Sequence, residues 1–131
     1  MRIEKDYTSV MNIAHRGARS LAPENTIAAA EKALENHADG WELDVMMSAD
    51  GELVVVHDDT LQRTSNVSDV FTERKPWSVH EFTLAELKQL DFGSWFVESD
   101  PFGQIALGSL TDNDLEKLRG VKIPTLAEAL V

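Results

Sequence analysis

The chain alternates short apolar runs with polar clusters, and this pattern predicts an α/β fold. Apolar stretches predict three strands, over Val10–Ala14, Trp41–Met47 and Leu53–Val56. Apolar residues recur at helical spacing over Asn25–His37, where several alanines also favour a helix. The pair Asp50-Gly51 between the last two strands is a strong turn signal. The first half of the chain is therefore expected to run strand, helix, strand, turn, strand.

The second half has a weaker pattern. Two stretches, Asp59–Val79 and Asp91–Ser109, have no clear period and are predicted to be loops. A short helix is predicted over Thr83–Leu90, with a capping box at its start. A second short helix is expected over Thr111–Leu118. The region after residue 58 therefore reads as loops joined by short helices.

The chain ends inside a predicted element. Thr125 and Glu128 have the spacing of a capping box, and apolar residues follow at helical positions. The sequence stops at Val131, about two turns into that helix, if a turn takes 3.6 residues. We therefore expect a fragment or an intentionally shortened chain.

Composition narrows the classes of protein that fit. The chain has 131 residues, a net charge of −11 and no cysteine. This length suits one domain. The negative charge argues against binding to nucleic acid or to anionic membranes, and without cysteine no disulfide or thiolate metal site is expected. Residues 1–9 show no leader peptide and no long apolar run, so we expect a cytoplasmic protein without stable membrane insertion.

Polar clusters lie in or after each of the three predicted strands: His15-Arg16, the pair Glu42 and Asp44, and His57-Asp58. In parallel α/β folds, side chains at the carboxyl ends of strands converge on one site. The clusters are therefore the candidate catalytic residues.

Glu42 and Asp44 are two positions apart on a strand, so their side chains point the same way. Two carboxylates facing the core would be destabilising unless a cation lay between them. Oxygen ligands suit Mg²⁺ or Ca²⁺. In the alternative, this face meets solvent, and Trp41, Leu43 and Val45 form the core face.

The turn also relates Asp44 to His57. If Asp50-Gly51 forms a two-residue hairpin loop, His57 lies directly opposite Asp44. If the two strands run parallel instead, both residues lie near the carboxyl ends of their strands. Either topology brings the carboxylate close to the imidazole, and the sequence alone leaves both open.

Two histidines that each close a strand suggest an acid–base pair, because histidine titrates near neutral pH. The alternative is that each is a structural residue. Arg16 has the planar fork that binds phosphate, although it could equally be a surface residue or pair with a carboxylate. His37 and His80 lack this context and are expected to be structural or at the surface.

Taken together and in order, these motifs resemble the glycerophosphodiester phosphodiesterase family. The segments that carry the resemblance are His15-Arg16-Gly17, Pro23-Glu24-Asn25-Thr26, Glu42-Leu43-Asp44-Val45, Asp50-Gly51, Val56-His57-Asp58, Arg63-Thr64, Gly93-Ser94-Trp95-Phe96 and Ile123-Pro124-Thr125-Leu126. The resemblance implies an α/β fold of the TIM-barrel type, as in phospholipase-C-like phosphodiesterases, of which this chain holds the first half and an inserted subdomain.

The resemblance also implies boundaries and roles. Residues 1–58 would supply the first barrel strands, 59–109 the inserted subdomain over the barrel mouth, and 110–131 the return to the barrel. By similarity, His15 and His57 match the catalytic acid–base pair, Arg16 a phosphate-binding residue, and Glu42 with Asp44 two metal ligands. The family's third metal carboxylate and a nearby lysine would lie on the next strand, after Val131.

The activity implied is metal-dependent hydrolysis of a small-molecule glycerophosphodiester to glycerol 3-phosphate and an alcohol, a reaction of glycerol and lipid metabolism, with Mg²⁺ or Ca²⁺ as cofactor. Water or the glycerol 2-hydroxyl could be the nucleophile, with His15 as base and His57 as acid. One alternative is a non-catalytic half-barrel, acting alone or pairing with a second copy as a homo-oligomer. Another is a lysophospholipase D activity at the same site, suggested only by the aromatic residues Trp77, Trp95 and Phe96, which are expected to be exposed.

Overall fold

Two short parallel strands joined by a helix organise the start of the fold. The computed structural model describes residues 10–131. Strand β1 (Ile13–His15) pairs in parallel with β2 (Gly40–Glu42), and helix α1 (Ile27–Glu35) connects them. Parallel strands need such a crossover connection. The side chain of Thr26 caps the helix by accepting a hydrogen bond from the Ala29 N–H at 3.2 Å.

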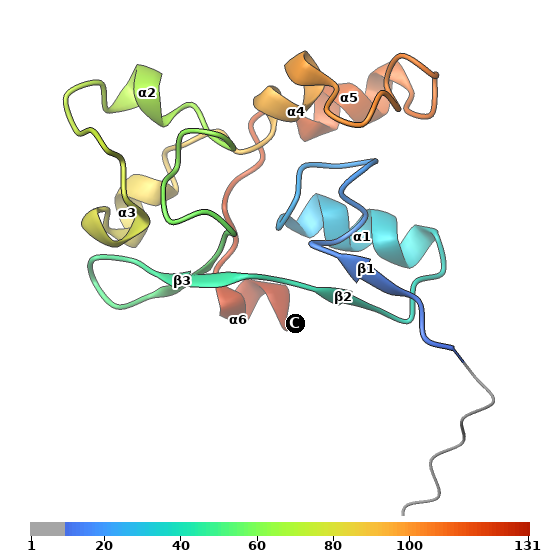
Figure 1. The fold of residues 1–131 in the computed structure, drawn as a ribbon, viewed down its shortest axis with the longest axis horizontal. Coiled ribbons are helices and arrows are strands. Elements are labelled where there is room, and N and C mark those ends of the chain that lie inside the picture. Colours follow the sequence, from blue (N-terminus) through green and yellow to red (C-terminus); the bar gives the residue numbers. More distant parts are fainter. Residues whose placement is uncertain (1–9) are drawn as a thin grey trace, which may run out of the picture.

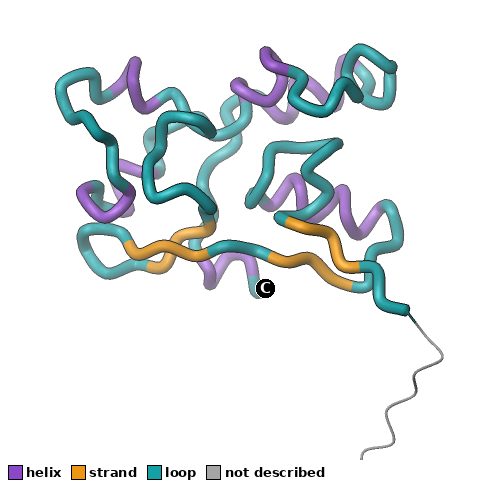
Figure 2. Tube along the Cα trace, in the orientation of Figure 1, coloured by secondary structure: helices purple, strands orange, loops and turns teal. Residues whose placement is uncertain are grey.

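The second sheet is a hairpin. Strands β3 (Val45–Met47) and β4 (Leu53–Val55) are antiparallel, with Val45 opposite Val55. Figure 2 shows β2 and β3 as parts of one extended run, separated by loop residues. The strand predicted over residues 41–47 is therefore divided, and the antiparallel alternative is the one found.

The hairpin register differs by one residue from that of a two-residue loop. The Ser48 N–H acts as donor and the Glu52 carbonyl as acceptor, which leaves Ala49, Asp50 and Gly51 in the loop. Gly51 has φ +85°, a left-handed conformation that glycine adopts without strain. Val56 rather than His57 consequently lies opposite Asp44, and its N–H donates to the Asp44 carbonyl at 2.9 Å.

Short helices fill the rest of the described chain. Those after residue 58 are α2 (Val67–Val70), the 3₁₀ helix η1 (Val79–Glu81), α3 (Leu84–Leu87), α4 (Ser94–Ser99), α5 (Asp112–Leu118) and α6 (Leu126–Ala129). The helices expected over residues 83–90 and 111–118 are confirmed. The prediction that 59–79 and 91–109 are only loop is wrong, because α2 and α4 form there.

Two hydrophobic clusters hold these elements together. The first packs the hairpin against the segment that follows it, through residues such as Val54, Leu61 and Phe82. The second packs α1 against α4 and α5, through Ala29 and Phe96 among others. Figure 1 shows residues 59 to about 90 over the hairpin and α4 with α5 over α1. The segment that follows α5 returns to β4, where Val54 forms a bridge with Thr125.

Some aromatic residues and two histidines were expected to lie at the surface. Trp77 and Phe96 are buried, so the prediction of exposed aromatics is wrong for both, and the hint of lipid-like substrates is lost. These rings instead fill the two clusters. His37 and His80 are exposed, as expected.

Within residues 10–131, no helix has the length and apolar character needed to cross a membrane. Residues 1–9, where no leader peptide was expected, lie outside the described part. The cytoplasmic location stays a prediction.

Candidate active site

The parallel register places His15 directly beside Glu42 at the end of the first sheet. His15 Nε2 lies 3.8 Å from Glu42 Oε2, and the Arg16 backbone N–H donates to the same oxygen at 3.1 Å. Arg16 has φ +58°, so its backbone turns sharply where the strand ends. The junction of β1 and β2 therefore gathers an imidazole, a carboxylate and a turned backbone N–H.

The guanidinium of Arg16 lies between two carboxylates. Its Nη1 donates to Glu24 Oε1 at 3.1 Å, and its Nε lies 3.4 Å from Asp44 Oδ2. The side chain is only 15% exposed. Its Nε is buried and makes no hydrogen bond within residues 10–131. Arg16 is thus paired with carboxylates, one of the alternatives left open above, and keeps one donor unused.

Asn25 holds Asp44 in a reciprocal pair. The Asn25 side-chain amide donates to Asp44 Oδ2 at 3.0 Å, and the Asp44 backbone N–H donates to Asn25 Oδ1 at 3.2 Å. The Asn25 backbone N–H also donates to the Arg16 carbonyl at 2.9 Å. Asn25 is buried and has φ +57°. It therefore ties the carboxylate to the loop that carries Arg16.

Arg63 joins two further carboxylates. Its Nη1 and Nη2 donate to the two oxygens of Glu24 at 3.0 and 2.7 Å. Its Nε and Nη2 donate to the two oxygens of Asp58 at 2.8 and 2.9 Å. Asp58 Oδ1 in turn lies 2.7 Å from His57 Nδ1. We call Glu24, Arg63 and Asp58 the carboxylate clamp.

The clamp changes the proton affinity of its members. The hydrogen bond from Arg63 is the largest cause that lowers the pKa of Asp58 to about 2. Burial raises the pKa of Glu24, but bonds and charges from Arg63 and Arg16 outweigh this, so its net pKa is lowered. Hydrogen bonds to Asp58 and then Glu24 raise the pKa of Arg63. The clamp is thus two carboxylates and one guanidinium, all charged at neutral pH.

The predicted residues fall into two groups. His15, Arg16, Glu42 and Asp44 share direct contacts. His57 makes none with them among the described residues, because the register sets it one position beyond Asp44. It is joined to Arg16 instead, through the clamp.

Sequence reasoning gave no role to Glu24, Asn25 or Arg63, and it named Asp58 only as part of the His57-Asp58 cluster. Each lies inside a segment that carries the family resemblance, which was the available signal.

Glu42 and Asp44, the two predicted metal ligands, meet some of the requirements of a Mg²⁺ or Ca²⁺ site. Within residues 10–131, Glu42 Oε1 and Asp44 Oδ1 make no hydrogen bond, so each carboxylate keeps one oxygen available. Both side chains reach solvent. The alternative in which Val45 belongs to the core face does not hold, because Val45 is 37% exposed while Met46 packs against the core. No group of three His, Asp or Glu residues that could hold a metal occurs in the described chain.

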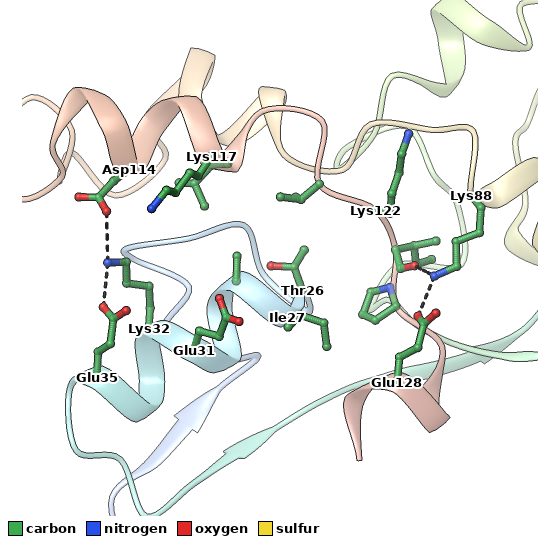
Figure 3. A pocket seen from close by; sticks show the side chains of 15 residues that line it. Thr26, Ile27, Glu31, Lys32, Glu35, Lys88, Asp114, Lys117, Lys122 and Glu128 are labelled. Carbon is green, nitrogen blue, oxygen red and sulfur yellow. Dashed lines mark hydrogen bonds and ion pairs between the residues drawn. The ribbon is translucent and has the colours of Figure 1, made fainter. Parts of the chain in front are cut away.

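Two hollows flank helix α1, and none of the predicted site residues lines either one. One has a volume of about 480 Å³ and lies between α1, α5 and the segment after α5. Figure 3 shows two of its four lysines in ion pairs: Lys32 with Glu35 and Asp114, and Lys88 with Glu128. The other, of about 390 Å³, lies between α1, β2 and α6. The predicted site residues therefore lie outside both hollows.

Comparisons with solved structures agree with this fold. A glycerophosphodiester phosphodiesterase from Agrobacterium tumefaciens superimposes with a TM-score of 0.69 at 37% identity, covering 93% of this chain and 42% of that one. An Oleispira antarctica phosphodiesterase, solved with the product sn-glycerol-3-phosphate, gives 0.67 at 36% identity, covering 92% and 38%. The expected fold class, α/β with part of a TIM-type barrel, is confirmed.

Sequence comparisons point the same way. A glycerophosphodiester phosphodiesterase of Bacillus subtilis is 40% identical over 121 residues, which are 92% of this chain and 35% of the relative. A glycerophosphoinositol inositolphosphodiesterase of Mus musculus is 42% identical over 118 residues, 90% of this chain and 22% of the relative. The chain thus spans between about a fifth and two fifths of these proteins. The model of the glycerophosphoryl diester phosphodiesterase family matches residues 15–131, and the chain belongs to that family.

Proposed function

We propose that the full-length protein hydrolyses glycerophosphodiesters to glycerol 3-phosphate and an alcohol. The observation that carries this proposal is the cluster of His15, Arg16, Glu42 and Asp44 at the end of the parallel strands. Family membership and the product bound to the Oleispira relative support the class of substrate.

We propose that Glu42 and Asp44 would hold Mg²⁺ or Ca²⁺ through their available oxygens. When bound, such an ion supplies positive charge next to a phosphate oxygen. Arg16 would bind a second phosphate oxygen, and this role is supported by its Nη2, which makes no hydrogen bond within residues 10–131. The phosphate then competes with Glu24 and Asp44 for this guanidinium.

The two imidazoles, of His15 and His57, carry out the proton transfers. His15 Nε2 takes a proton from the nucleophile, which is water or the glycerol 2-hydroxyl, while the nucleophile's oxygen bonds to phosphorus. The bond from phosphorus to the leaving alcohol breaks, and His57, which enters this step with a proton on both ring nitrogens, gives the leaving oxygen the proton of Nε2. Contact between His57 Nδ1 and Asp58 supports the choice of Nε2. With the 2-hydroxyl as nucleophile, water opens the cyclic phosphate in a second step.

We also propose the division of the chain into 1–58, 59–109 and 110–131. The first cluster supports the first boundary, because buried residues between Leu61 and Phe92 pack on the hairpin. The inserted segment then carries Arg63 towards the strand ends.

The proposal is tested with glycerophosphocholine and the full-length protein in Mg²⁺ or Ca²⁺. Replacing His15 or His57 by Ala should lower kcat by about 10²–10⁴-fold, the usual contribution of acid–base catalysis. His37→Ala and His80→Ala are matched controls, because both residues are exposed, and should keep wild-type rates. Near wild-type turnover in both His15→Ala and His57→Ala would refute the proposal.

The non-catalytic half-barrel stays a second candidate, favoured by the two-carboxylate site. Its test is to assay the 131-residue chain by itself with either metal ion. We expect little or no hydrolysis, since two protein ligands should hold the ion weakly. Turnover comparable to that of the full-length protein would exclude this candidate.

A further inference from the structure

We propose that Arg63 is a positioning residue, whose guanidinium holds the His57 imidazole in place relative to Arg16 by binding Asp58 and Glu24 together. The inference rests on the proposed function, because it assigns Arg63 a part in that reaction. It assigns no contact between Arg63 and the substrate.

The geometry of the fork carries the first step. Arg63 binds both oxygens of Asp58 and both oxygens of Glu24, at 2.7–3.0 Å. Two-pronged contacts of this kind fix orientation as well as distance. Every nitrogen of the guanidinium is already engaged with a carboxylate. Arg63 is therefore a connector between two carboxylates, whereas the Nη2 of Arg16 makes no hydrogen bond within the described residues.

The second step concerns His57. Among the described residues, its only side-chain partner is Asp58, whose Oδ1 lies 2.7 Å from Nδ1. An ionised carboxylate only accepts hydrogen bonds, so Nδ1 carries the proton in this pair. The other ring nitrogen, Nε2, is then left free of this contact. The hairpin hydrogen bonds end at Val56, so no strand partner orients His57. The contact with Asp58 orients its imidazole instead.

The third step links His57 to the other half of the site. Glu24 is 7% exposed and binds Arg16 and Arg63 through the same oxygen, Oε1. Arg16 reaches Asp44, so an unbroken series of charged contacts runs from His57 to the predicted metal ligands. Arg63 is the one member of this series contributed by the segment after residue 58. Without the Arg63 side chain, Asp58, which contacts His57, would no longer be linked to Glu24 and Arg16.

The test compares kcat and KM for glycerophosphocholine in the full-length protein. In Arg63→Gln we expect kcat to fall about 10–100-fold, because a small misplacement of a catalytic group has effects of that size. KM should change less than about threefold, since Arg63 does not touch the substrate. The matched control is Arg74→Gln. Arg74 also pairs with a carboxylate, Glu86, and donates to the Glu81 carbonyl, outside the clamp. It should keep wild-type kcat.

Two further measurements separate positioning from loss of fold. Adding methylguanidine to Arg63→Ala should restore part of kcat, because the free guanidinium can occupy the space between the two carboxylates. In Asp58→Asn/Arg63→Gln, the loss of kcat should match that of the worse single variant, because both act on His57 through one path. Full additivity of the two losses would overturn the proposal, and so would an absence of rescue.

The outcomes also distinguish this inference from the proposed function. An inactive full-length wild type overturns the proposed function and the role of Arg63 with it. An active wild type with unchanged kcat in Arg63→Gln overturns the role of Arg63 alone. If circular dichroism shows that Arg63→Gln is unfolded, Arg63→Lys takes its place. Lysine keeps the charge but lacks the fork, so the same loss of kcat is expected, and wild-type kcat would overturn the role.

Discussion

Two residues of the site, the half-buried Arg16 and the buried Asn25, have left-handed backbone conformations that few side chains adopt. Their φ angles are +58° and +57°. Such conformations cost of order 1–3 kcal/mol each and persist where surrounding contacts hold them. Here the contacts are the bonds from Arg16 to Glu42 and between Asn25 and Asp44. The local strain is thus retained where two loops meet the strand ends.

The individual residues differ in how far the sequence reveals them. His15 and Glu42 could be assigned to one site because both belong to polar clusters in or after predicted strands, and such clusters converge in parallel α/β folds. Asn25 could not, since its role depends on a left-handed backbone that no hydrophobic pattern encodes. Arg63 lies 39 positions from Glu24, and side-chain pairing over such a separation leaves no periodic signal.

The lowered pKa of Asp58 gives a stability prediction at acidic pH. Because the folded-state pKa is about 2, below the ordinary 3.8, the carboxylate's stabilising contribution is complete above about pH 4 and is lost as pH falls through about 2. Urea unfolding of the full-length protein across this range should show the loss. In Asp58→Asn the free energy of unfolding should fall less steeply between these pH values.

The control for this pH experiment is Asp59→Asn, which changes the neighbouring carboxylate. Asp59 has no side-chain ion pair within the described residues. Its variant should therefore follow the wild-type pH dependence. If Asp58→Asn and the wild type lose stability in parallel, the pairing of Asp58 with Arg63 contributes nothing in solution.

Helix ends explain which elements could be predicted. The capping boxes expected at Thr83 with Glu86 and at Thr125 with Glu128 are both confirmed. Helix α4 gave no such signal, because its N-cap is Gly93 and it has no side-chain cap bond there. Its residues Trp95, Phe96 and Val97 also favour strands over helices. Tertiary contacts, above all burial of Phe96, outweigh that preference.

Asp91 takes the place of the missing cap on α4. Its carboxylate accepts hydrogen bonds from the Gly93 and Ser94 backbone N–H groups at 2.8 and 2.9 Å, and from Gly120 at 3.2 Å. Asp91→Ala should lower the free energy of unfolding by about 2 kcal/mol, because several bonds to one charged group are lost. The change is measured by urea or thermal unfolding.

Glu116→Ala is the control variant for Asp91→Ala. Glu116 is exposed on α5 and has no side-chain ion pair within the described chain. Its variant should stay within about 0.5 kcal/mol of wild type. Equal effects of Asp91→Ala and Glu116→Ala would mean that the bonds to Asp91 do not stabilise α4.

The hairpin loop shows the limit of turn chemistry as a predictor. Asp50-Gly51 is compatible with a two-residue loop and with the longer loop that forms, because both place glycine in a left-handed conformation. A difference of one residue moves each side chain relative to its partner. The turn itself could therefore be predicted, but the neighbour of Asp44 could not.

At the scale of the whole molecule, motif order was the strongest predictor. Short segments distributed from residue 15 to residue 126 identified the family, and the family model matches nearly the same span. The packing of the two hydrophobic clusters was not predictable in this way. It depends on how residues after 58 fold back on the hairpin and on α1, which is a long-range property.

The proposed metal binding can be measured in the full-length protein without an assay of activity. Mg²⁺ or Ca²⁺ at several times its Kd, of order 10⁻⁴–10⁻³ M for a site with few protein ligands, should raise the melting temperature of the full-length protein. EDTA should remove the increase and abolish glycerophosphocholine hydrolysis. Glu42→Gln/Asp44→Asn should show no increase with either ion. An equal increase in that double variant would place metal binding elsewhere.

The end of the β3–β4 ladder at Val56 has a consequence for heat inactivation. One imidazole is anchored by strand pairing at residue 42, whereas the other depends on a guanidinium from the segment after residue 58. Warming that releases this segment would separate acid from base while the sheets stay intact. Turnover would then vanish several degrees below the temperature at which the secondary structure melts.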